Sequence, residues 1–160
     1  MNKSAVHQAI VQKLQQDLDL LARAVEMARD AATHSENQAR SKYETMATEA
    51  SYLAQGQGRR LLEIQKALEY FLLNRNSIQT STERVGLNSL CLLENEDGEN
   101  FYVWVAEYAG GLRVLAGGEE IKVITPSSPL GQQLLKASLQ DEIRLTIRGA
   151  EQVYRVNSIR

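Results

Sequence analysis

The sequence has little of the residues that mark disulfide-rich, fibrous or disordered proteins. Its 160 residues include one cysteine, two prolines of which the first stands at position 126, and no glycine before position 56. Cys91 therefore has no partner for an internal disulfide or a cysteine-based zinc site, which fits a reducing compartment. An apolar fraction of 43% with nearly balanced charge argues against intrinsic disorder and against a collagen-like fibre.

Long apolar runs and a broad basic surface are also missing. No uninterrupted apolar run approaches the roughly 20 residues of a membrane-spanning helix, and residues 1–4 lead into polar amphipathic sequence instead of a secretory h-region. The formal charge is −2, which does not favour a nucleic-acid-binding arm. We therefore expect a cytoplasmic protein with no membrane partner and no direct sequence-specific nucleic-acid binding.

Residues 5–73 are dominated by strong helix formers, and their apolar residues recur every three or four positions. This spacing predicts one helix over residues 5–32 and a second that ends near residue 73, packed as an antiparallel hairpin that reverses at residues 32–38. The expected seam between the helices consists of Leu14, Leu18, Leu21, Met46, Leu53, Leu61, Ile64 and Leu68.

Two residue types in the helical sequence, glycine and histidine, need a separate interpretation. Gly56 and Gly58 flank Gln57 inside the second helix, where each glycine costs roughly 1 kcal/mol relative to alanine. We favour close helix approach or a local bend here over a phosphate-binding loop. His7 falls in the first turn of the first helix, where we expect it to be solvated, and His34 falls in the expected reversal.

After residues 74–77 the apolar period changes from that of a helix to that of a strand, which predicts two domains, 1–75 and 76–160. Ser128 is a suitable N-cap for a short helix with Pro129 at its first position. The second domain is predicted to be a small α+β unit with strands over residues 90–93, 101–105, 112–115, 121–124, 143–147 and 153–156.

The sequence contains no phosphate-loop, HExxH, CxxC or dinucleotide-binding motif, so we expect no self-contained enzyme. Cys91 is interpreted as a small apolar residue in a strand. Trp104 with Phe101, Tyr102 and Tyr154 could line a pocket, but aromatic residues on alternating strands more often belong to a core.

The segment from residue 124 to 135, continued at 139–143, resembles the Ser-Pro-Leu-(Gly/Ala)-x-x-Leu-(Leu/Ile)-Gly and hydrophobic-Gly-Asp motifs of the bacterial transcription elongation factors GreA and GreB. Two family glycines are replaced, by Lys136 and Gln140. The resemblance covers nearly the whole chain. It implies an α+β fold class, with an N-terminal long antiparallel α-helical hairpin (coiled coil) followed by a small FKBP-like α+β domain.

The resemblance also implies a function. A member of this family binds RNA polymerase through its C-terminal domain and inserts the hairpin into the secondary channel. The partner-binding residues would be Ser127, Ser128, Pro129 and Leu130. At the hairpin tip, acidic residues of the family help to hold a catalytic Mg²⁺ for cleavage of backtracked RNA, since a hard cation prefers carboxylate oxygens.

The tip sequence departs from the family pattern Asp-Leu-Ser-Glu-Asn. Matching it to residues 33–37 keeps Glu36 and replaces the first acid by Thr33. Anchoring instead on the later Gly58-Arg59 moves the match to residues 41–43, where Lys42 replaces the glutamate. Neither register preserves the acidic pair.

The tip candidates are Asp30, Glu36 and Glu44, with Glu36 as the candidate Mg²⁺ ligand only within the polymerase complex. Arg40 and Lys42 lie among them and would repel Mg²⁺, and a mixed-charge solvated helix end is the alternative interpretation. We expect no intrinsic cofactor beyond Mg²⁺ shared with RNA polymerase.

The expected role is regulatory, by weakened cleavage stimulation or by competition with true cleavage factors, and the protein is expected to be a monomer. The alternatives are an FKBP-like peptidyl-prolyl isomerase or chaperone module and a coiled-coil adaptor.

Overall fold

A computed structural model describes residues 1–36, 44–75, 83–147 and 149–160, and for residues 31–36, 44–55 and 147 it describes the backbone alone. Contacts divide the chain into a helical unit, Lys13–Leu68, and a sheet unit made of Met1–Gln12 and Glu69–Arg160. The predicted boundary after residue 75 follows the change in sequence pattern. The division by contacts differs, because both ends of the helical sequence group with the strands.

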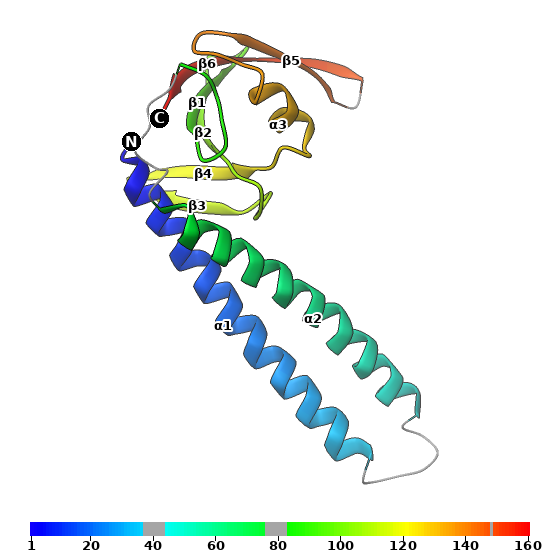
Figure 1. Ribbon diagram of the computed structural model, residues 1–160. Coiled ribbons are helices and arrows are strands. Elements are labelled where there is room, and N and C mark those ends of the chain that lie inside the picture. Colours follow the sequence, from blue (N-terminus) through cyan, green and yellow to red (C-terminus); the bar gives the residue numbers. More distant parts are fainter. Residues whose placement is uncertain (37–43, 76–82, 148) are drawn as a thin grey trace. The chain divides into compact units, whose positions relative to one another are not determined.

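Two long helices, α1 (Lys3–Glu36) and α2 (Glu44–Leu73), confirm the helices predicted from the apolar spacing (Figure 1). Helix α1 starts at Lys3 because the Asn2 Oδ1 accepts hydrogen bonds from the backbone N–H groups of Ser4 and Ala5, at 2.9 and 3.3 Å. It continues to Glu36, so the reversal predicted at residues 32–38 is wrong for 32–36. The sequence there favours the helix, since residues 31 and 32 are alanines. Residues 37 and 38 lie outside the described residues.

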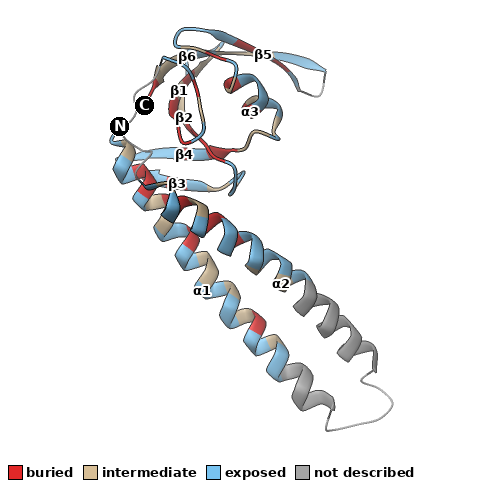
Figure 2. Cartoon of the chain, in the orientation of Figure 1, coloured by how far each residue is buried: buried red, intermediate tan, exposed pale blue. Residues whose placement is uncertain are grey.

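The helical unit buries one stripe of each helix, as predicted from apolar residues that recur every three or four positions (Figure 2). Leu18, Leu21 and Leu61 of the predicted seam are half-buried. Met46 and Leu53 belong to α2, but their side chains lie outside the described part. Four residues of the seam are less than a tenth exposed: Leu14, Val25, Ile64 and Leu68. Three large apolar residues of the same helices point outward instead: Leu20, Met27 and Leu62.

The two glycines of α2 do not serve close helix approach. The helix runs through Gly56 and Gly58 without interruption, and among the described atoms a Cβ added at either residue would meet nothing within 4 Å. The close-approach interpretation is therefore wrong, because space is present where contact was expected.

The sheet unit contains a six-stranded mixed sheet in the order β3-β4-β2-β1-β6-β5. Neighbouring strands are antiparallel except β2 and β4, which are parallel and are connected through β3. The fold class is α+β, as predicted, although β6 is longer than expected. The strands are β1 (Leu90–Asn95), β2 (Asn100–Val105), β3 (Arg113–Ala116), β4 (Glu119–Ile124), β5 (Glu142–Ile147) and β6 (Ala150–Ile159).

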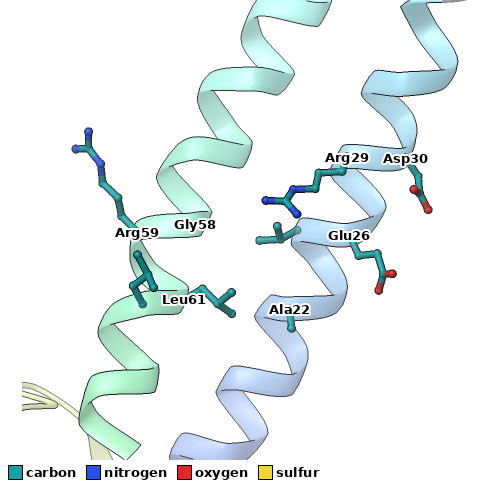
Figure 3. A pocket seen from close by; sticks show the side chains of 9 residues that line it. Ala22, Glu26, Arg29, Asp30, Gly58, Arg59 and Leu61 are labelled. Carbon is teal, nitrogen blue, oxygen red and sulfur yellow. The ribbon is translucent and has the colours of Figure 1, made fainter. Parts of the chain in front are cut away.

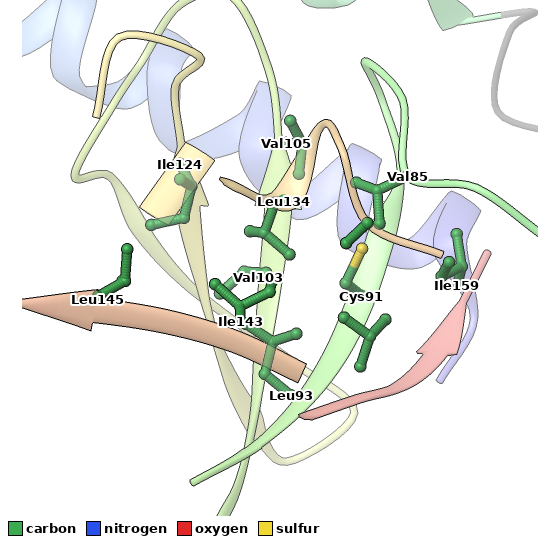
Figure 4. Close-up of a cluster of buried hydrophobic side chains, with 12 residues drawn as sticks. Val85, Cys91, Leu93, Val103, Val105, Ile124, Leu134, Ile143, Leu145 and Ile159 are labelled. Atoms are coloured by element: carbon green, nitrogen blue, oxygen red, sulfur yellow. The ribbon is translucent and has the colours of Figure 1, made fainter. Parts of the chain in front are cut away.

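Alternate residues of the strands face two apolar layers. One face packs with the short helix α3 (Pro129–Leu134), and the Leu134 side chain enters the centre of that layer (Figure 4). Val103 and Val105 of β2 point to this face, whereas Trp104 between them points to the other. The α3 layer consists of Val85, Cys91, Leu93, Val103, Val105, Ile124, Leu134, Ala137, Ile143, Leu145, Val156 and Ile159.

Phe101, Trp104 and Tyr154 of the strands belong to these layers, on opposite faces of the sheet, and Tyr102 is half-buried. Trp104 is fully buried beside the Phe71 ring, with 6.2 Å between ring centroids. Phe101 and Tyr154 form an edge-to-face pair at 5.6 Å against the α3 layer. The core interpretation of Trp104 is confirmed.

His7 is not solvated. It is 6% exposed, and its Nε2 lies 2.8 Å from the carbonyl oxygen of Phe71 in the last turn of α2. Because a carbonyl only accepts, Nε2 carries the proton, and the imidazole satisfies a carbonyl that the end of the helix leaves without an intrahelical partner. Its ring also packs 6.0 Å from that of Trp104. The expectation of a solvated histidine is wrong because its partner is distant in sequence.

This burial predicts a pH-dependent stability. Burial lowers the pKa of His7 from 6.5, and the nearby Arg75 acts in the same direction, against the Phe71 hydrogen bond. The unfolded chain then binds the proton more readily, so the free energy of unfolding should fall as the pH drops below about 6.5. Urea unfolding followed by Trp104 fluorescence at pH 7.5, 6.5 and 5.5 measures this. His7→Gln keeps an amide donor and should show a smaller loss over the same interval; equal losses would contradict the assignment.

Candidate functional site

The segment that carries the family resemblance forms the connection between β4 and α3. Ser128 is the N-cap of α3, since its Oγ accepts from the Gly131 N–H at 3.1 Å and donates to the Thr125 carbonyl oxygen at 2.8 Å. Pro129 follows at the first helical position, as the sequence predicts. The cap thus bonds both to the helix and to the residue that follows β4.

Glycine at position 131 is required by close backbone packing. A Cβ there would lie 2.0 Å from the Thr125 carbonyl oxygen, which no side chain tolerates. A Cβ at Gly110 would lie 2.8 Å from the Thr125 Cγ2 on another side. The connection is therefore fixed by contacts around Thr125.

The four predicted partner-binding residues divide into two kinds. Ser127 and Pro129 are exposed, and their side chains are accessible to a partner. Ser128 and Leu130 are half-buried, the first as the cap and the second against the α3 layer. The structure brings all four together on one turn, where two build the turn and two face outward.

The two positions where the sequence departs from the family motif differ in conformation. Gln140 has a φ of 71°, in the left-handed region that favours glycine. Its N–H donates to the Val156 carbonyl oxygen at 2.8 Å, which ties the turn to β6. Lys136 is not among the described residues with positive φ. Only the first replacement therefore introduces backbone strain.

The candidate tip carboxylates are placed only in part. Asp30 lies on the exposed surface of α1, and its side chain points away from α2 (Figure 3). Glu36 is the last residue of α1 and Glu44 the first of α2, and the side chains of both lie outside the described residues. No group of three metal-binding side chains is present among the residues that the structure describes.

A groove lies between the two helices, which the sequence reasoning did not predict (Figure 3). Val25 and Leu61 belong to its apolar lining, and Arg29 of α1 reaches toward α2 above them. Gly58 lines it from α2. Of the glycine pair noted in the sequence, Gly58 is the member that lines the groove, and it is the sequence signal for it.

The single cysteine has no place in a reactive site. Cys91 is fully buried in β1, and burial raises the pKa of its thiol to about 12. The thiolate that a nucleophile or metal ligand needs is therefore scarce near neutral pH. Its interpretation as a small apolar residue in a strand is confirmed.

No helix in the described ranges has the length and apolar content that crossing a lipid bilayer requires.

No protein-family model matches the chain, and no curated protein matches it significantly. Among solved structures, GreA factor homolog 1 (Gfh1) of Thermus thermophilus is similar at 22% identity over 95% of both chains, with a TM-score of 0.40. The Thermus aquaticus Gfh1 shares 19% identity over 95% of this chain and 94% of its own, with a TM-score of 0.38. A GreA/GreB elongation factor from Nitrosomonas europaea shares 23% over 51% of this chain and 64% of its own, with a TM-score of 0.37. At these values no argument about function rests on the likeness.

The strain at Gln140 yields a matched pair of variants. Gln140→Gly should raise the free energy of unfolding by about 0.5–1 kcal/mol, because relief of a left-handed side-chain conformation exceeds the added freedom of the unfolded chain. Lys136→Gly should lower it by about 0.5–1 kcal/mol, since no strain is relieved there. Urea unfolding followed by Trp104 fluorescence compares the two. Shifts of the same sign would show that the turn is not strained.

Proposed function

We propose that this protein regulates transcription elongation by binding RNA polymerase, with its helical hairpin inserted in the secondary channel. The observation that carries the proposal is the combination, in one chain, of two long helices with a small α+β unit whose β4–α3 connection holds the Ser-Pro-Leu-Gly motif. Ser128 and Gly131 give that motif a defined backbone shape. The FKBP-like description of the α+β unit and a cytoplasmic location remain predictions from sequence.

The length of the helices suits insertion into a narrow channel. Helix α1 has 34 residues, which at 1.5 Å per residue makes a rod of about 50 Å. Two helices that share one apolar stripe form a rod only two helices wide, and its outward surface is mostly polar, with Leu20, Met27 and Leu62 as exposed apolar side chains. Such a rod can occupy a water-filled channel with only scattered apolar side chains on its surface.

Docking would use the exposed half of the β4–α3 connection. Ser127 and Pro129 present a hydroxyl and a ring to solvent, and the Ser127 hydroxyl also shares a hydrogen bond with the Thr125 hydroxyl at 3.0 Å. Residues 76–160 carry 11 acidic and 8 basic side chains, so a basic surface of the polymerase is the favoured counterpart. The same charge balance gives no support to direct binding of nucleic acid.

The tip sequence supports regulation more than efficient cleavage. In the register that keeps Glu36, this carboxylate ends α1, where the last carbonyl groups add partial negative charge that attracts a cation. Thr33 supplies no second carboxylate, so Mg²⁺ would be held weakly. We infer weak stimulation of cleavage or competition with true cleavage factors, with Mg²⁺ shared with the polymerase.

The alternatives receive less support. A prolyl isomerase needs an open apolar pocket, whereas Trp104 is covered by His7 and Phe71. A coiled-coil adaptor would use the helices alone and would leave the exposed β4–α3 connection without a role.

The docking assignment predicts the effect of two matched surface variants of the full chain. Ser127→Arg should weaken binding to core RNA polymerase by about tenfold or more, since it places a bulky cation in the contact. Thr146→Arg makes a similar change at an exposed position of β5 and should leave affinity unchanged. Fluorescence anisotropy with labelled protein, and competition with GreA, measure both. Failure of the natural chain to bind, or equal affinities of both variants, would remove this docking face.

The broken acidic pair predicts weak or absent cleavage of backtracked RNA by the natural protein. Thr33→Asp should raise the cleavage rate by about tenfold, equivalent to ~1.4 kcal/mol of barrier, if the register that keeps Glu36 is right. In the other register Lys42→Glu is the activating change. RNA cleavage by stalled polymerase is the assay, with Glu36→Ala as a third variant. Natural cleavage at the level of GreA, insensitive to Glu36→Ala, would contradict this account of the tip.

A further inference from the structure

The β4–α3 connection has a neighbour at the same edge of the sheet. Strands β2 and β4 are parallel, so their carboxyl ends meet there, and the β2–β3 connection, residues 106–112, lies beside the β4–α3 connection (Figure 1). The Ala106 N–H donates to the Ile124 carbonyl oxygen at 3.0 Å. The Gly111 N–H donates to the Val123 carbonyl oxygen at 2.9 Å. The β2–β3 connection is therefore fixed to the end of β4.

The two connections form one continuous surface through Thr125. A Cβ at Gly110 would lie 2.8 Å from the Thr125 Cγ2 and 3.2 Å from its Oγ1, so the backbone of the β2–β3 connection packs directly on this side chain. The same Oγ1 shares a hydrogen bond with the Ser127 hydroxyl at 3.0 Å. One threonine thus links the β2–β3 connection to the exposed part of the candidate docking site.

Ala109 holds the β2–β3 connection in a conformation that alanine seldom adopts. Its φ is 63°, in the left-handed region where the Cβ crowds the backbone. Its carbonyl oxygen accepts from the Leu112 N–H at 3.0 Å, and the next residue, Gly110, is packed against Thr125. Strained residues persist where the surrounding contacts over-determine the backbone, and they concentrate at binding sites. The side chains that this connection presents to solvent are therefore candidates for binding a partner.

Tyr108 is the aromatic side chain that the β2–β3 connection presents. It is 38% exposed, and its ring packs on that of Tyr70, with 5.5 Å between the ring centroids. Tyr70 is itself held, because its hydroxyl donates to the Oδ1 of the buried Asn88 at 3.0 Å. A ring already supported from one side loses little conformational freedom when a partner covers it, and such tyrosines commonly anchor protein interfaces.

The charge of this surface favours a cation as the counterpart of the ring. Residues 106–112 and 125–129 contain one charged side chain, the exposed carboxylate of Glu107, directly before Tyr108 in the chain. The face of an aromatic ring attracts a cation, and a neighbouring carboxylate adds to that attraction. A guanidinium group can also stack flat on the ring, which makes arginine the best fit and lysine the second.

We propose that Tyr108 is the anchor of the docking surface and that, together with Glu107, it takes an arginine or lysine side chain of RNA polymerase. The inference deepens the proposed function and rests on it, since it names the chemical group of the polymerase that the docking surface binds. The surface then extends from Ser127 and Pro129 across Thr125 to the β2–β3 connection.

Binding of the full chain to core RNA polymerase, measured by fluorescence anisotropy, tests the ring. Tyr108→Leu keeps an apolar side chain beside Tyr70 but removes the aromatic face, so it should weaken binding by about tenfold or more. Tyr108→Phe keeps that face and should bind within about threefold of the natural chain. Leu115→Ala is the control and should leave the affinity unchanged, because this side chain is 75% exposed but lies on β3, away from the connections.

Removal of the charge tests the carboxylate at an exposed position. Glu107→Gln should weaken binding by about threefold or more and reduce the dependence of the affinity on salt, since salt screens an attraction between opposite charges. Glu119→Gln removes another exposed acid, at the start of β4 and therefore at the opposite edge of the sheet, and should change neither quantity.

The outcomes separate this inference from the proposed function. If the natural chain does not bind RNA polymerase, both are wrong. If the natural chain binds and Tyr108→Leu binds as tightly as Tyr108→Phe, the cation site is wrong and the proposed function stands. An equal loss of affinity in Leu115→Ala and Tyr108→Leu would also overturn the assignment of Tyr108 as the anchor.

Discussion

The burial of Trp104 is the contact on which the sheet unit depends. The first turns of α1 and the last turn of α2 cover this indole, through His7 and Phe71, and the Lys3 ammonium lies 5.8 Å from the centre of its ring. Without these two helix ends, one face of the sheet would expose its largest apolar side chain to water. The sheet unit is therefore not the C-terminal segment alone, and the helices that extend into the helical unit begin and end as parts of its core.

Local signals in the sequence predicted most elements of the fold. The N-cap at Ser128 and the proline after it act through residues at most a few positions away, so both partners of each interaction can be seen in a short stretch of sequence. His7 could not be interpreted in this way, because its partner is 64 residues distant and nothing near it in the sequence indicates burial. The interpretation of the α2 glycines was wrong for another reason. In a sequence, a glycine beside empty space cannot be distinguished from a glycine that lets two helices come into contact.

The candidate docking site was predicted more fully than the candidate tip. The sequence predicted that residues 127–130 lie on one turn. The structure was needed to distinguish the exposed Ser127 and Pro129 from the half-buried Ser128 and Leu130. Asp30 was grouped with Glu36 and Glu44 by sequence distance, whereas its position on α1 directs its side chain away from α2. The direction of a side chain depends on its position around the helix axis, and closeness in sequence to other charged residues does not give that position.

The discontinuity of the sheet unit has a consequence for the order of folding. Closing a loop of 64 residues to bring His7 to Phe71 costs an unstructured chain of order 4 kcal/mol in entropy. A helical hairpin forms from contacts that are local in sequence and brings the two ends of residues 13–68 together as it forms. We therefore expect the hairpin to form first and to remove most of that entropic cost before Trp104 is covered. A substitution that weakens the seam within residues 13–68 is then expected to slow the folding of the sheet unit, although the substituted residue belongs to the other unit.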